Sequence, residues 1–111
     1  MSKMCLTKLL SASLLGLMVF STSAMAKEIE VVNISKIDGM PWFNRMGEGV
    51  TKAGSDLGIK ASQVGPSSTD APQQVKIIED LIAKKVSAIG IVPNDADVLE
   101  PVFKKAREAG I

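Results

Sequence analysis

The sequence predicts an α/β protein: a three-layer sandwich with a parallel sheet, strand order 2-1-3 and element order β-α-β-α-β-α. Three short, largely apolar segments alternate with three segments whose apolar residues recur at steps of three and four. A single helical segment separates each pair of strands. Because such crossovers are right-handed, the strands form one parallel sheet with helices on both faces.

The first strand and helix are predicted from a change in periodicity. Residues 28–35 form a short alternating and apolar run typical of a strand, and residues 39–41 interrupt it. Between residues 42 and 57 the apolar side chains lie on one face of a helix that ends at Gly58. Gly47, Gly49 and Gly54 lie inside this helix, and each costs up to about 1 kcal/mol relative to alanine. We therefore expect close packing against a sheet to hold the helix.

The second strand and helix carry clearer boundary signals. Residues 59–64 are predicted as a strand and residues 65–69 as a loop. Asp70 is a suitable N-cap, and Pro72 lies in the first turn, where a missing N–H is harmless. Lys84 and Lys85 come near the end of the helix, where positive charge suits the helix dipole. The apolar stripe consists of Val75, Ile78, Leu81 and Ile82.

The third strand, residues 87–92, is apolar after its first residue, which is typical of a central parallel strand. Asp95 is expected to cap a third helix that runs to Gly110. With three strands in the order 2-1-3, this apolar strand would be a sheet edge, which proteins usually protect. We therefore expect residues 27–111 to be the front part of a larger architecture, truncated before a fourth strand. The alternatives are a complete small domain and one completed by a partner's strand.

The N-terminus has the pattern of a cleavable secretory signal. Lys3 and Lys8 precede an apolar run over residues 9–20, and Ala24, Met25 and Ala26 form a small-x-small cleavage site. The run is too short for a bilayer-spanning helix, which needs about 20 residues. Residues 1–26 are thus predicted as a signal peptide cleaved after Ala26, and the mature protein as periplasmic. An uncleaved anchor or a buried helix is the alternative interpretation.

Composition excludes several classes of function. The 111 residues carry a net charge of +1, one cysteine and no histidine. Near-neutral charge argues against nucleic-acid binding, and the missing histidine and cysteine clusters exclude the usual zinc sites, so no metal is predicted. Phosphate-binding and nucleophile-elbow motifs are missing, as are the usual nucleophile and base pairs. The sequence therefore predicts no catalytic residues, no cofactor and no enzyme activity.

A ligand site is expected where the order of parallel strands reverses, beyond the carboxyl ends of strands one and three. Lys36 comes directly after the first strand and could donate hydrogen bonds to ligand oxygens. From the residues alone, a salt bridge from Lys36 to Asp38 or Asp95, or plain exposure to solvent, is an alternative role for this side chain.

Two aromatic residues follow in the same loop region. Trp42 and Phe43 could stack on a sugar ring, but both adjoin the apolar face of the first helix. We therefore expect one of them to belong to the core and the other to face the cleft. Asn44 is expected to cap the helix, with ligand binding as its alternative role.

Residues 28–111 resemble the N-terminal lobe of type I periplasmic sugar-binding proteins of ABC importers. The segment Met40-Pro41-Trp42-Phe43 resembles the Asn-Pro-Phe-Phe loop of ribose binders, although Met40 replaces the asparagine. Further similarity lies at the start of the second helix, in the third strand and its following loop, and at the end of the third helix: Gln73–Ile82, Val86–Ile89, Pro93–Asp97 and Ala106–Ile111.

Within that family, Lys36 ahead of Ile37-Asp38-Gly39 and the aromatic pair looks most like the autoinducer-2-binding branch. The resemblance implies that Lys36 hydrogen-bonds a hydroxylated furanose and that Trp42 and Phe43 line the cleft. It also implies further ligand contacts after a fourth strand and in a second lobe, in segments that would follow Ile111.

The function expected from this resemblance is that of a periplasmic solute-binding component of an ABC importer. Such a protein would capture a small sugar or an autoinducer-2-like ligand, act as a monomer and deliver the ligand to a membrane permease. Two alternatives remain. One is a secreted flavodoxin-like enzyme or module, and the other is a fragment without function.

Overall fold

The computed structural model describes residues 25–111. The predicted signal peptide therefore lies outside the described residues, except for Met25 and Ala26, which are exposed and belong to no helix or strand. No helix in the described part of the chain is long and apolar enough to cross a membrane.

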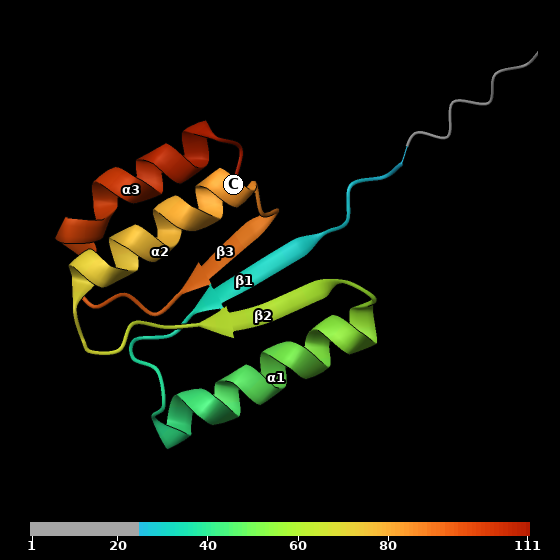
Figure 1. Ribbon diagram of the computed structural model, residues 1–111, viewed down its shortest axis with the longest axis horizontal. Helices are drawn as coiled ribbons and strands as arrows, with labels where there is room; N and C mark the ends of the chain where they lie inside the picture. The colour runs from blue at the N-terminus through green and yellow to red at the C-terminus, as the bar shows by residue number, and fades with distance from the viewer. Residues whose placement is uncertain (1–24) are drawn as a thin grey trace, which may run out of the picture.

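The elements follow the predicted order. They are β1 (Glu30–Ile34), α1 (Pro41–Leu57), β2 (Lys60–Val64), α2 (Ala71–Lys84), β3 (Ala88–Ile91) and α3 (Ala96–Glu108). The strands are parallel in the order β2-β1-β3, with Val32 of β1 opposite Ser62 on one side and Ile89 on the other. Figure 1 shows α1 on one side of this sheet and α2 with α3 on the other. The predicted fold class and strand order are therefore confirmed.

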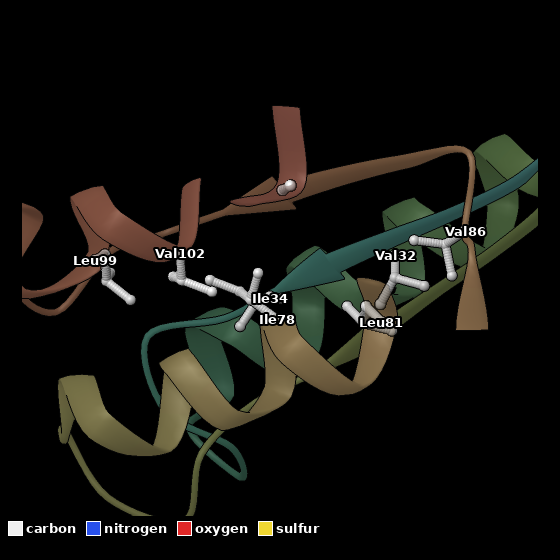
Figure 2. Packing of buried hydrophobic residues seen from close by; sticks show 8 residues of the cluster. Val32, Ile34, Ile78, Leu81, Val86, Leu99 and Val102 are labelled. Carbon is white, nitrogen blue, oxygen red and sulfur yellow. The ribbon is translucent and has the colours of Figure 1, made fainter. Parts of the chain in front are cut away.

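The core lies between β1 and the pair of helices α2 and α3. Val32 and Ile34 point from β1 to this side of the sheet, and Figure 2 shows Ile34 next to Ile78 of α2. Leu99 and Val102 contribute the α3 side, and both are nearly inaccessible to solvent. Removal of this apolar surface from water is the main force that holds α2 and α3 on the sheet. The buried cluster consists of Val32, Ile34, Ile78, Leu81, Val86, Leu99, Val102 and Ala106.

The helix boundaries combine expected and unexpected caps. Gly58 ends α1 in the left-handed conformation, with φ of 66°, as predicted. Asp95 caps α3 by accepting a hydrogen bond from Val98 N at 3.0 Å, also as predicted. Asp70 occupies the N-cap position of α2, but its side chain makes no capping hydrogen bond. Asn44 does not cap α1: it lies within the first turn, while Met40 is the N-cap residue.

Lys85, at the end of α2, adopts φ of 58°, which is costly for a residue with a Cβ atom. Lys85→Gly is therefore expected to raise the free energy of unfolding by about 0.5 to 1 kcal/mol. Thermal unfolding of the purified variant measures the change. Lys84→Gly is the matched control, because position 84 is the last residue of the right-handed helix and glycine there should destabilise. Stabilisation by both substitutions, or by neither, would contradict this prediction.

Of the three glycines of α1, Gly54 and Gly47 lie close to β2 and Gly49 lies in open space. A Cβ atom on Gly54 would lie 2.7 Å from Ala61 Cβ and 3.1 Å from Ile59 O, whereas one on Gly49 would have no neighbour within 4 Å. The expected close approach of this helix to the sheet is therefore confirmed at Gly54, which contacts β2 and the residue before it.

Gly54→Ala is expected to lower the free energy of unfolding by about 1 to 3 kcal/mol, because the added methyl group forces α1 away from β2. Gly49→Ala should instead raise it by up to about 1 kcal/mol through better helix propensity. Urea unfolding of the two variants tests the difference, and effects of the same sign would count against it.

Candidate functional site

The carboxyl ends of β1 and β3 lie side by side at one end of the sheet (Figure 1). From β1 the chain crosses to β2 on one side and later to β3 on the other, so the order of strands reverses here. Ligands of open α/β sheets bind beyond the strand ends at such a position. The loop after β1, residues 35–40 (the β1 loop), and the loop after β3, residues 92–95 (the β3 loop), therefore form the candidate site.

Hydrogen bonds fix the β1 loop from both sides. Toward β2, Ser35 N donates to Val64 O and Asp38 N donates to Pro66 O, both at 2.8 Å. Toward β3, Asn94 Nδ2 donates to Lys36 O at 2.9 Å. The main chain that carries Lys36 is thus held between the two neighbouring loops.

Lys36 is exposed at this position. The two carboxylates considered as its salt-bridge partners are engaged elsewhere: Asp38 Oδ1 accepts from Gly39 N at 2.9 Å, and Asp95 Oδ1 accepts from Val98 N. Neither forms an ion pair with Lys36, and within residues 25–111 the Lys36 ammonium has no ion-pair partner. Its three donor hydrogens are therefore free to bind an oxygen-rich ligand.

The aromatic pair separates as expected into one buried and one exposed ring. Phe43 is 8% exposed, whereas Trp42 is 76% exposed. Gln63 Nε2 donates to Phe43 O at 2.7 Å and so ties the first turn of α1 to β2. Trp42 lines a surface hollow of about 220 Å³ with Arg45 and Met46 from the next turn of its own helix. An indole at this exposure can stack on a ligand ring, and the buried Phe43 ring supports the turn that carries it.

Two other hollows lie away from these loops. One of about 260 Å³ is apolar, is lined by Ile89, Ile91 and Phe103 among others, and follows the free edge of β3. The other, of about 530 Å³, lies at the opposite end of the sheet, near Lys27 and Ser87. Neither contains Lys36, Trp42 or Phe43. Among the described residues, no cluster of acidic, cysteine or histidine side chains could hold a metal ion.

Sequence reasoning missed Gln74 and placed Asn94 in a loop of the site without assigning it a role. Gln74 is fully buried. Its Nε2 donates to Ser35 O at 3.1 Å and Val92 O at 2.8 Å, and its Oε1 accepts from Asn94 N at 2.8 Å. One side chain therefore joins the ends of β1 and β3. The sequence does contain one sign that Gln74 is buried. It precedes Ile78 by four residues, so it lies on the apolar stripe of α2.

The sequence of this sheet and its loops matches a known family. A family model described as a periplasmic binding protein domain matches residues 31–111, which include β1 apart from Glu30, all three helices and both loops of the candidate site. The chain belongs to this family. The predicted family is thereby confirmed at the level of periplasmic binding protein domains.

Two curated relatives bind sugars according to their names. The D-ribose/D-allose-binding protein of Pseudomonas aeruginosa is 46% identical over 43 residues, which are 39% of this chain and 14% of that protein. The D-xylose-binding periplasmic protein of Haemophilus influenzae is 31% identical over 97 residues, 86% of this chain and 29% of that protein. The chain therefore spans less than a third of the length of either relative.

Solved structures show the same fold with different ligands. An ABC transporter solute-binding protein from Burkholderia graminis in complex with D-arabinose is 38% identical, with a TM-score of 0.73, over 78% of this chain and 29% of that one. LsrB from Clostridium saccharobutylicum in complex with AI-2 is 26% identical, with the same TM-score of 0.73, over 75% of this chain and 26% of that one. Because the TM-scores are equal, likeness of fold does not select one ligand.

These relatives are solute-binding proteins rather than enzymes. Membership of the family favours the solute-binding interpretation over a flavodoxin-like enzyme. It does not test the roles of Lys36, Trp42 and Phe43, which stay predictions.

Proposed function

We propose that this chain is the N-terminal part of a periplasmic solute-binding protein that captures a small sugar or an autoinducer-2-like ligand for an ABC importer. The observation that carries the proposal is Lys36, a lysine without an ion pair in the described chain, at the strand-order reversal of a periplasmic binding protein fold. The sugars and AI-2 bound by its relatives are rich in oxygen, which suits an ammonium donor.

In this proposal the protein binds its ligand non-covalently and catalyses no reaction. The Lys36 ammonium donates to ligand oxygens, the exposed Trp42 covers the apolar face of a ring, and the buried Phe43 anchors the first turn of α1, which carries Trp42. Specificity arises because a wrong ligand leaves buried polar groups unpaired. Residues 1–26 direct export and are removed after Ala26, and residues 27–111 contribute one side of the site. The mature protein works in the periplasm as a monomer and passes the ligand to a membrane permease.

A ligand panel tests the proposal. Isothermal titration calorimetry on the purified chain would compare D-ribose, D-allose, D-arabinose, D-xylose and AI-2, with glycine as a ligand that offers no hydroxylated ring. A chimera provides the rest of a two-lobed binder: residues 31–111 replace the matching segment of the Burkholderia graminis protein. We expect saturable binding of at least one panel member by the chimera. A chimera with native circular dichroism that binds none of them would refute the proposal.

A further inference from the structure

Gln74 and Asn94 connect the interior of the protein to the main chain of Lys36. Gln74, from the first turns of α2, bonds Ser35 O, Val92 O and Asn94 N; Asn94 then bonds Lys36 O. Helix α2 is therefore bonded to the β3 loop, and the β3 loop is bonded to the β1 loop. All of the bonds from these two side chains to the loops end on backbone atoms, so they act on the position of the loops.

The orientation of the Asn94 amide is fixed by this arrangement. Its Nδ2 must face Lys36 O, because a flipped amide would place two acceptors against each other. Its Oδ1 is then buried without a hydrogen-bond partner, the one such side-chain atom among the described residues. A buried acceptor without a partner costs free energy. Asn94 thus gains a hydrogen bond through Nδ2 and leaves one acceptor unpaired, so its net contribution to stability is small and its main effect is on the position of the β1 loop.

We propose that Gln74 and Asn94 are positioning residues that fix the backbone at Lys36 and so present its ammonium to the ligand. The consequence for binding rests on the proposed function, whereas the consequence for loop order does not. Removal of the Asn94 side chain frees Lys36 O and leaves the β1 loop held by Gln74 at Ser35 O and by the contacts to β2, such as Asp38 N to Pro66 O. The β1 loop then opens more often. Lys36 has to become ordered when the ligand binds, which weakens binding.

Amide hydrogen exchange followed by NMR on the purified chain tests the loop directly. In Asn94→Ala, we expect the Asp38 N–H, which is bonded to Pro66 O, to exchange about tenfold faster. The melting temperature should stay nearly unchanged, because the lost hydrogen bond and the removed unpaired acceptor offset each other. Unchanged exchange at Asp38, or faster exchange at every protected amide together with a lower melting temperature, would overturn the proposal.

Gln73→Ala is the matched control. Gln73 is the neighbouring glutamine on the same helix, but its side chain forms hydrogen bonds with Ser67 and Ser68 in the loop after β2. This variant should speed exchange of the Ser67 N–H, which donates to Gln73 Oε1, and leave the Asn94 N–H, which donates to Gln74 Oε1, unaffected. Gln74→Met should speed exchange of the Asn94 N–H, which loses its acceptor. If Gln74→Met does not fold, Asn94→Ala alone decides the proposal.

Affinity for D-arabinose, measured by calorimetry on the chimera, tests the effect on Lys36. Asn94→Ala should weaken binding about tenfold when Lys36 is present, and should have no further effect in the Lys36→Met background. Equal losses in the two backgrounds would show that Asn94 acts independently of Lys36 and would contradict the positioning role. If the unaltered chimera does not bind D-arabinose, the exchange data still decide whether the two residues hold the loop.

Discussion

Leu99→Ala is expected to lower the free energy of unfolding by about 2 to 5 kcal/mol. Leu99 is 0% exposed, and it belongs with Ile34 and Ile78 to the core cluster. Alanine at this position removes the apolar contacts and leaves a cavity that a small sheet with two covering helices can fill only in part. Since domains are stable by only about 5 to 15 kcal/mol, the loss is a large share of the total.

Chemical denaturation of the purified chain measures this effect. Val98→Ala is the control: Val98 is the adjacent residue of α3 and is 45% exposed, so its truncation should change stability by less than about 0.5 kcal/mol. If Leu99→Ala is unfolded at the outset, Leu99→Met gives a measurable value, expected below about 1.5 kcal/mol. A loss of less than 1 kcal/mol for Leu99→Ala would mean that α3 does not pack on the sheet as described.

The fold could be predicted because the change between strand and helix periodicity is clear along the chain and several boundary residues agree with it. The apolar stripe of α2 and its proline in the first turn both mark the same helix, and Gly58 marks the end of α1. The strand ends were less certain: residues 28–35 were predicted and β1 spans Glu30–Ile34. Sheet hydrogen bonds continue past both ends of β1, since Ile29 O accepts from Lys60 N and Ser35 N donates to Val64 O, so the sequence pattern does not define a sharp end. Lys85 was missed as a left-handed cap because no glycine or asparagine marks it.

The site was only partly predictable, because two of its determinants depend on tertiary contacts. A sequence places Asp38 and Asp95 near Lys36, but only the structure shows that one oxygen of each carboxylate accepts from a backbone amide and that neither carboxylate pairs with Lys36. A glutamine on a helix is normally taken as exposed. Gln74 is buried because carbonyl groups from β1 and the β3 loop converge on it, and that convergence is set by strand order. Sequence periodicity gives its position but not its partners.

Lys36→Ala is expected to weaken ligand binding by about 1.5 to 3 kcal/mol, or roughly 10- to 150-fold in Kd. The variant loses a charged donor whose oxygen partners in the ligand remain buried and unpaired. Calorimetry on the chimera with the panel sugar that it binds, or with AI-2, measures the change.

Lys84→Ala is the control for the change in net charge, because Lys84 lies in the last turn of α2, at the opposite end of the sheet from the β1 loop. Its substitution should leave Kd unchanged. Lys36→Gln should lie between the wild type and Lys36→Ala, since an amide keeps a donor but not the charge. Equal affinity in the wild type and Lys36→Ala would remove Lys36 from the binding site. A loss shared by Lys84→Ala would instead indicate a general effect of charge, which a neutral sugar gives no reason to expect.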